Sequence, residues 1–248
     1  MSRKVLLFLL IAALAALAGA KVTYAVGSVT FYRGGIAYTA SLNTKLSNGD
    51  IVRTGDRSKV ELTFSDGSIV RLSSNSELTV NRAESSGLGT STVLTCAGGR
   101  LWSNVIPFKE GGDSSYVVKT PTSTAAVRGT IFRTNVGADT STSVRVYDGQ
   151  VEVSRSSLPA DGGFGDAIPA DWGSGDRHEI EGPIEVEGPT EVSEDEWAQI
   201  IGNMQEVIIG ADGSTWVGSF TNDDDSSEWE WVLWNQSRDT ELGMDAEH

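Results

Sequence analysis

The sequence predicts an all-β main lobe followed by a small C-terminal α+β appendage. In the main lobe, short segments of alternating apolar and polar residues are separated by glycine turns, which is the pattern of β-strands. Further along the chain the composition shifts to acidic residues, proline and tryptophan, and one stretch has helical spacing. The predicted parts are an export segment (1–20), the main lobe (21–155), a connector (156–192), the appendage (193–235) and a disordered acidic tail (236–248).

Residues 1–20 have the composition of a secretory signal peptide. Arg3 and Lys4 precede an uncharged apolar run over residues 5–17, and small residues follow as far as Ala20. This run is shorter than the roughly 20 apolar residues that cross a bilayer as a helix. We expect cleavage near Ala20 and a periplasmic or secreted mature chain without a transmembrane span. Retention of the segment as an N-terminal anchor is the alternative.

Strand alternation is clearest in four stretches of the main lobe, namely residues 29–32, 59–64, 68–72 and 143–153. In the second of these, Val60, Leu62 and Phe64 share one face and the polar residues between them share the other. Such a strand buries one face and exposes the other to water. Before residue 154 no stretch combines helical spacing with caps, so we expect almost no helix there.

Two Asp-Gly pairs separate consecutive predicted strands: Asp66 with Gly67, and Asp148 with Gly149. Glycine accepts the positive φ that tight hairpin turns require, and aspartate bonds the turn backbone. We predict a hairpin at each pair.

The net charge of −15 is distributed unevenly. Residues 21–158 contain 15 Lys and Arg against 11 Asp and Glu, whereas residues 159–248 contain 2 against 23. The acidic part either stays solvated or folds against the more basic lobe, and we expect it to stay solvated. This distribution argues against nucleic acid or an anionic membrane as a partner.

The connector holds four of the six prolines and is expected to be extended. Ile180, Ile184 and Val186 would allow one short strand within it.

A helix is predicted after the connector. The sequence from Ser193 to Glu196 is a capping box, and apolar residues follow at helical spacing as far as Gly210. These apolar residues are Trp197, Ile200, Ile201, Met204 and Val207. Strands are predicted next over residues 214–217 and 228–234, and a disordered acidic tail ends the chain.

Two sets of spaced residues in the main lobe resemble the FecR domain. The opening set consists of Gly49, Asp50, Thr54, Gly55, Asp66 and Gly67, in and around alternating strands. The closing set consists of Thr120, Pro121, Val127, Arg128, Gly129, Thr130, Asp148 and Gly149. Both sets occur in the order of that family.

The resemblance implies a coiled, β-solenoid-like or rolled β architecture. In the best-known FecR proteins this region is the periplasmic part of a transmembrane regulator, which receives a signal from an outer-membrane transporter and controls a cytoplasmic anti-sigma segment. Here a signal peptide stands in the place of that segment, so we do not expect direct control of a sigma factor. We expect a binding or signal-sensing module of the cell envelope.

The motif residues suit structural roles, because glycine fits tight turns and Asp and Thr side chains bond nearby backbone groups. Arg128 has two interpretations. Its planar guanidinium is suited to holding an anion or carboxylate, or it pairs with acceptors inside the lobe, which we favour.

An enzyme is not expected. The two histidines, His178 and His248, lie in the connector and at the last position, and no Gly-x-Ser-x-Gly elbow is present. Paired His or Cys at zinc spacing are missing, and no cofactor is expected. Cys96 lies in an apolar stretch and is expected to be buried. Paired carboxylates leave a polysaccharide-acting enzyme as a third, less favoured hypothesis.

Two features of the acidic part offer binding hypotheses. Asp223 and Asp225 form a weak calcium candidate that lacks the EF-hand pattern, so we expect no metal. Trp229, Trp231 and Trp234 form a candidate binding surface, with Trp229 and Trp231 on one face of the predicted strand. The partner is therefore an envelope protein or, alternatively, a glycan bound by the tryptophans.

Overall fold

The computed structural model describes residues 19–86, 89–108, 113–156, 198–221, 224 and 228–244. Several predictions concern residues outside these ranges: residues 1–18 of the export segment, residues 157–192 of the connector, the capping box, Trp197 and the calcium candidates Asp223 and Asp225. In the described part, no helix is both long enough and apolar enough to span a bilayer.

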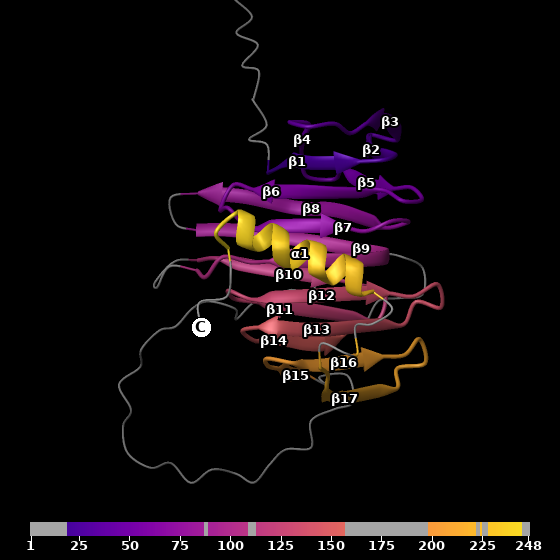
Figure 1. Ribbon diagram of the computed structural model, residues 1–248, viewed down its shortest axis with the longest axis vertical. Coiled ribbons are helices and arrows are strands. Elements are labelled where there is room, and N and C mark those ends of the chain that lie inside the picture. The colour runs from indigo at the N-terminus through magenta and orange to yellow at the C-terminus, as the bar shows by residue number, and fades with distance from the viewer. Residues whose placement is uncertain are drawn as a thin grey trace, which may run out of the picture.

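The described strands form two layers, which we call sheet A and sheet B. In order of pairing, sheet A contains β4 (Lys45–Leu46), β1 (Ala20–Val26), β6 (Lys59–Phe64), β7 (Ile69–Leu72), the end of β9 (Gly89–Asn104), β12 (Ile131–Val136), β13 (Thr142–Asp148), β16 (Gln205–Ile209) and β17 (Thr215–Ser219). Sheet B contains β3 (Ile36–Thr39), β2 (Val29–Arg33), β5 (Ile51–Thr54), β8 (Glu77–Ser86), the start of β9, β10 (Ser115–Lys119), β11 (Ser123–Val127), β14 (Val151–Arg155) and β15 (Ala198–Ile201). The one described helix, α1 (Trp229–Glu241), lies across the strands in Figure 1.

The strands follow one another along the long axis of the molecule, from β2 to β4 at one end to β15 to β17 at the other (Figure 1). In the described part, the first and last strands of each sheet are not paired with each other, so neither sheet closes into a barrel. The predicted β fold class, and the near absence of helix before residue 154, are confirmed for the described residues. The coiled solenoid arrangement stays a prediction, because all ladders except β9 with β10 are antiparallel.

Strand β9 joins the two sheets. Gly98 is still paired with Glu77 in sheet B, whereas Gly99 already faces Val136 in sheet A. The backbone of Gly99 has a φ of +88°, which is a conformation that favours glycine. The glycine pair therefore lets one long strand change layers.

The core lies between the sheets. Leu62 and Phe132 enter it from sheet A, and Leu94 and Val118 enter it from sheet B, all fully buried. Strand alternation explains this, because every second residue points inward. Cys96 is buried among them, as the sequence predicted, and this burial raises the pKa of its thiol to about 12.

The two Asp-Gly turns have different outcomes. Gly67 closes a hairpin between β6 and β7, and Asp66 accepts a hydrogen bond from the backbone of Ser68 at 2.9 Å. The hairpin predicted at Asp148 and Gly149 is wrong, because β13 pairs with β12 and β16 whereas β14 pairs with β11 and β15. Gly149 keeps its positive φ, but it turns the chain from one sheet to the other.

The helix predicted up to Gly210 is wrong over the described residues, which form β15 and β16. Ile201 and Val207 enter the core, and Met204 turns the chain between the two strands with a φ of +57°. The physical reason is that β13 and β14 offer unpaired backbone edges to this segment. Ile and Val side chains suit such edges better than a helix. The strand predicted over residues 214–217 is confirmed in β17.

The strand predicted over residues 228–234 is also wrong, because this segment begins helix α1. The alternation of Trp and Glu resembles a strand, but Trp231, Asn235 and Asp239 are buried at helical spacing against sheet A. The predicted disordered tail is helical as far as Glu241, and Asp239 within it is 3% exposed.

We predict that Gly99→Ala destabilises the protein far more than Gly34→Ala. Both glycines have a positive φ, which costs other residues about 1–2 kcal/mol. A Cβ on Gly99 would also lie 2.6 Å from the Cα of Ser76, whereas nothing lies within 4 Å of one on Gly34. Urea unfolding followed by circular dichroism measures both variants. Equal losses of stability would contradict a tight change of layer at Gly99.

Candidate functional site

Along the strands of sheet A, aliphatic side chains that point inward alternate with charged side chains that point outward. In β7, Val70 and Leu72 belong to the core, and Arg71 between them points outward. Its side chain is nevertheless 0% exposed, because α1 covers it. We call six outward residues that bind α1 or the residues directly before and after it the covered face; they are Glu61, Arg71, Arg100, Trp102, Asn104 and Arg133.

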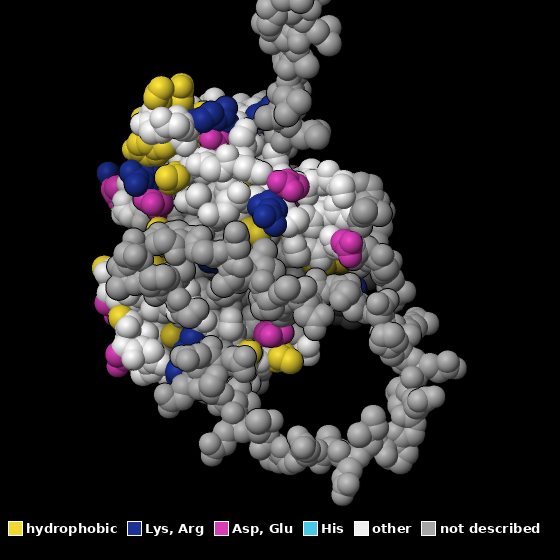
Figure 2. Space-filling model, turned by 180° about the vertical axis from the view of Figure 1, so that it is seen from behind, with side chains coloured by type: hydrophobic (Ala, Val, Ile, Leu, Met, Phe, Trp, Pro, Cys, Tyr) yellow, Lys and Arg dark blue, Asp and Glu magenta, His cyan; other side chains and the backbone are white. Residues whose placement is uncertain are grey.

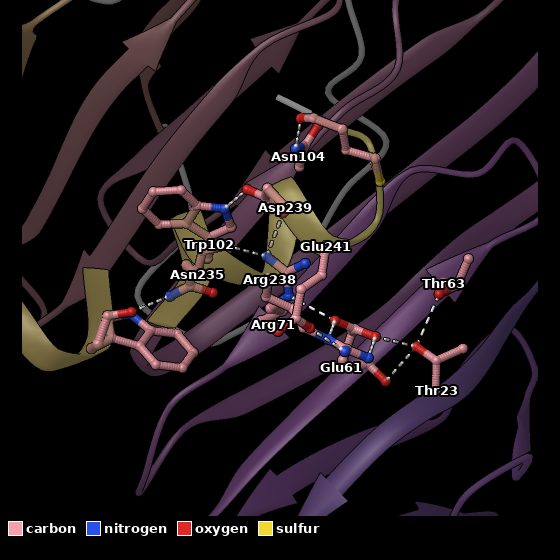
Figure 3. A network of polar contacts seen from close by, with 12 residues as sticks. Thr23, Glu61, Thr63, Arg71, Trp102, Asn104, Asn235, Arg238, Asp239 and Glu241 are labelled. Carbon is pink, nitrogen blue, oxygen red and sulfur yellow. Dashed lines mark hydrogen bonds and ion pairs between the residues drawn. The ribbon is translucent and has the colours of Figure 1, made fainter. Parts of the chain in front are cut away.

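Arg71 is the centre of a buried polar network (Figure 3). Its Nε donates to Oε2 of Glu61 at 2.8 Å, and its Nη1 donates to Oδ1 of Asp239 at 2.6 Å. The indole Nε1 of Trp102 donates to the other oxygen of Asp239 at 3.0 Å. Arg238 of α1 donates to Glu61 at 3.2 Å. Helix and sheet thus each contribute one buried carboxylate and one arginine.

The two ends of α1 are held separately. Glu228, directly before the helix, pairs with Arg100 at 3.2 Å and with Arg133 at 2.9 Å. After the helix, the side-chain amide of Asn104 donates to the carbonyl oxygen of Met244 at 2.9 Å. These contacts show that at least this part of the acidic half folds against the basic lobe, which corrects the expectation of a solvated acidic segment.

The two buried carboxylates have pKa shifts of opposite direction. Burial alone would raise the pKa of Glu61, but hydrogen bonds from Arg71, Arg238 and Thr23 outweigh it and lower the pKa. For Asp239, burial is the stronger effect and raises its pKa in spite of the nearby Arg71 guanidinium. The network therefore favours the charged form of Glu61 and disfavours the charged form of Asp239.

Aromatic rings fill the space beside the charges. Trp231 and Trp234 stack with their ring centroids 5.4 Å apart, and the ammonium group of Lys59 lies 4.6 Å from the centroid of Trp234. Trp102 packs against Tyr147 at 4.7 Å, and it forms a small apolar cluster with Trp231 and Val232.

The predicted surface of three tryptophans does not form as expected. Trp231 is 5% exposed and Trp234 is half-buried, because both pack on sheet A, whereas Trp229 is 39% exposed. Trp229 and Trp231 do not share a face, since two helical residues at this spacing point about 200° apart. The glycan hypothesis thus retains only Trp229 of its three residues as an exposed platform.

Gly49, Asp50, Thr54 and Gly55 of the opening motif lie at corners and turns of sheet B, whereas Asp66 and Gly67 form the β6–β7 turn of sheet A. Asp50 is 1% exposed, pairs with Arg33 at 2.6 Å and accepts the backbone N–H of Ser47 at 2.8 Å. The hydroxyl of Thr54 donates to the carbonyl oxygen of Ser73 and accepts the backbone N–H of Ser76 at 2.9 Å. Gly49 has a φ of +88°, and Gly55 packs beside Ser28.

The closing motif residues tie adjacent corners together. The hydroxyl of Thr120 accepts hydrogen bonds from the backbone of Ser123 at 2.9 Å and from the hydroxyl of Thr142 at 2.8 Å, next to the half-buried Pro121. The hydroxyl of Thr130 donates to the carbonyl oxygen of Gln150 at 2.8 Å.

The remaining residues of the closing motif surround one corner. Val127 is in the core, and Gly129 has a φ of +67°. A Cβ on Gly149 would lie 2.7 Å from the carbonyl oxygen of Gly129, and Asp148 is half-buried beside it. These glycines allow two corners to stack closely.

Arg128 lies apart from the other motif residues. It is exposed at the corner between β11 and β12, and it makes no hydrogen bond or ion pair within the described residues. The internal pairing that the sequence favoured for Arg128 is therefore not observed. Its guanidinium is available to an acceptor outside the lobe.

The FecR protein family matches residues 50–152 of this chain. The match runs from Asp50 into β14 and contains every motif residue of both sets except Gly49. The protein contains a FecR domain. This domain contributes all six residues of the covered face, whereas α1 lies outside the matched residues.

Two crystal structures of a "putative anti-sigma factor" from Parabacteroides distasonis ATCC 8503 are similar to this chain. Each shares 14% sequence identity with it, and the TM-scores are 0.45 and 0.46. The similarity covers 68% of this chain and 59% of the other, so the chain spans less than two thirds of that protein's length. No curated protein matches this FecR-domain protein.

Among the described residues, no three His, Cys, Asp or Glu side chains gather as metal ligands would, and His178 and His248 lie outside the described ranges. The FecR family is regulatory. The expectation of a protein without catalytic activity stays a prediction.

Sequence reasoning missed the covered face entirely. Glu61 and Arg71 occupy polar positions of alternating strands, which normally face water. Two signals pointed toward it: the opposite charges of the two halves, and Trp102, which is the one tryptophan before the acidic part.

We predict that Trp231→Ala weakens the docking of α1 strongly and that Trp229→Ala does not. Trp231 is buried against sheet A, and truncating a buried Trp costs about 3–5 kcal/mol. Trp229 is exposed, and its truncation changes stability by at most about 0.5 kcal/mol. Hydrogen exchange of the α1 amides measures the docking. Equal exchange rates in the two variants would contradict the observed packing.

We further predict that Glu61→Gln is most destabilising above about pH 4.5, the ordinary pKa of this carboxyl group. The lowered pKa means that the stability contributed by ionised Glu61 is present above that pH and is lost as the pH falls through the folded-state pKa. Removing one partner of a buried pair costs about 3–5 kcal/mol. Thermal unfolding between pH 3 and pH 7 measures the difference from the native chain.

Glu230→Gln is the matched control for this prediction, because Glu230 is an exposed acid on α1. Its effect on stability is expected to be small throughout the pH range. A constant difference between Glu61→Gln and the native chain at every pH would contradict a lowered pKa of Glu61.

Proposed function

We propose that this protein is a non-catalytic binding and signal-sensing module of the cell envelope. The observation that carries the proposal is the FecR domain at residues 50–152, which supports a regulatory role. The apolar run and small residues of the first 20 positions support export, with cleavage near Ala20 and a periplasmic or secreted product.

The geometry supports recognition of a protein partner. The inward side chains and the motif glycines of the FecR domain serve the packing of the two sheets, which leaves recognition to outward groups. Arg128 is such a group, because a stacked glycine corner holds its backbone while its guanidinium is exposed. Arginine forks bind carboxylates of a partner in this way.

A second exposed feature lies at the end of the molecule formed by the N-terminal strands. Figure 2 shows hydrophobic side chains gathered there, and Ile36, Tyr38 and Leu42 are 59%, 44% and 61% exposed. Ile36 and Tyr38 belong to β3, the edge strand of sheet B, whose outer edge is unpaired in the described part. An edge strand with apolar side chains is a template for binding an extended segment of a partner.

Site-specific photo-crosslinking in intact cells tests this proposal. A photoreactive amino acid replaces Arg128 or Tyr38, with Ser237 on the exposed side of α1 as the control position. We expect processed protein in the envelope fraction and one discrete protein adduct from Arg128 or Tyr38 that is missing from Ser237. Retention of the unprocessed chain in the cytoplasm, or identical adducts at all three positions, would contradict the proposal. Adducts to glycan alone would favour the glycan hypothesis instead.

A further inference from the structure

We propose that the covered face is a binding surface for an acidic amphipathic helix of a partner protein, and that α1 occupies it as the chain's own competing ligand. The inference rests on the proposed binding function and adds the chemistry of the partner.

The face has the chemistry of a receptor for carboxylates. Arg71, Arg100 and Arg133 project from three strands of sheet A, and each pairs with a carboxylate that belongs to α1 or directly precedes it. Glu228 and Asp239 are eleven positions apart, which is about 16 Å along a helix. Between them Trp231 and Val232 pack on Trp102. The face therefore recognises two acids about three turns apart with an aromatic anchor between them.

The same face is unusual as a permanent interior. Elements that are always covered normally bury apolar stripes, as the inward faces of both sheets do here. Beneath α1, Glu61, Arg71 and Arg133 are charged and at most 3% exposed. Burying an ion pair costs desolvation free energy, and much of this free energy is recovered when the partners separate and become hydrated. The charges of the covered face are thus suited to both a covered and an open state.

Helix α1 is held in a way that permits release. It contributes no strand to either sheet, so its departure leaves every described ladder intact. Its 13 residues are close to the length, about 12–15 residues, below which isolated helices are marginal in water. No side chain caps its N-terminus. The helix therefore depends on docking, and undocking and loss of helical structure occur together.

The contacts of α1 are incomplete, which gives a better-matched helix an advantage. The Nη2 atom of Arg71 is buried without a hydrogen-bond partner in the described part, although Arg71 is 0% exposed. The side-chain oxygen of Asn235, also buried in the interface, lacks a donor in the same way. Unpaired buried polar groups are costly. A helix that supplies one more acceptor to Arg71 would therefore bind this face more tightly than α1 does.

A peptide competition assay on the full chain tests the inference. The probe is a fluorescent peptide of residues 228–244, and a second peptide carries Gln and Asn in place of Glu228 and Asp239. The receptors are the native chain, the chain with Glu228→Gln, and the chain with Glu228→Gln and Asp239→Asn. The control receptor carries Glu230→Gln, since Glu230 is exposed on α1. Fluorescence anisotropy at low salt measures binding, and circular dichroism verifies that each receptor retains its sheets.

We expect the acidic peptide to bind the double variant at least tenfold more tightly than the native chain or the Glu230→Gln control. We also expect the neutral peptide to bind at least tenfold more weakly than the acidic one, and added salt to weaken binding. The single variant Glu228→Gln should bind the acidic peptide more tightly than the native chain does, but by a smaller factor than the double variant. Because it retains both ion pairs of Arg71, it keeps the test possible if the double variant does not fold.

Equal binding of the acidic and neutral peptides would overturn the inference. The inference would also be overturned if the acidic peptide did not bind variants in which fast hydrogen exchange of the α1 amides shows that the helix has left the covered face. Because purified protein is used, either failure concerns the covered face alone and leaves the envelope proposal to the crosslinking experiment.

Discussion

A fully buried guanidinium on the outward side of sheet A determines where the C-terminal helix lies. Arg71 is surrounded by strands on one side and by α1 on the other, and it needs carboxylates from both. Glu61 from the neighbouring strand satisfies one side of its fork, and Asp239 satisfies another. Asp239 is 168 positions away along the chain. One charged residue thus couples the FecR domain to a segment outside the region that defines the domain.

The two-layer architecture explains why such a residue can exist. Each strand gives one face to the core, and those faces are filled by aliphatic side chains. The outward faces are free of this constraint and can carry charge. The motif residues of the FecR domain lie mainly at corners, where glycine allows close approach and Thr or Asp bonds the backbone. The family motif therefore specifies the scaffold, and binding chemistry must be sought among outward residues such as Arg128 and the covered face.

The sequence predicted the local structure of the FecR domain well, because alternation and glycine turns are local signals. It could not predict which sheet each strand joins. Gly149 has the positive φ of a hairpin turn, but it connects a strand of one sheet to a strand of the other.

The structures of residues 198–209 and 228–234 differ from the prediction for a related reason. Ile201 and Val207 have a spacing that fits a helix, but the open edges of β13 and β14 decide their structure. The alternation of Trp and Glu at the start of α1 fits a strand, but ion pairs with the covered face stabilise the helical structure of this segment. The candidate site was hidden because Glu61 and Arg71 look like solvent-facing residues until their distant partners are placed.

The opposite pKa shifts of Glu61 and Asp239 set the conditions under which α1 is held. A raised pKa means that docked Asp239 binds a proton more tightly than free Asp239, so mild acid favours docking through this group. Glu61 acts in the opposite direction, because its lowered pKa means that the stability it contributes is lost as the pH falls through its folded-state pKa. Burying the charged form of Asp239 is costly, because its carboxylate gives up water for Arg71 and Trp102. Through Asp239 alone, the helix is therefore held less tightly when this carboxyl group is ionised than when it is protonated. In the proposed exchange both helices would present carboxylates to the covered face, so the number and placement of acceptors around Arg71 would decide which of them binds more tightly.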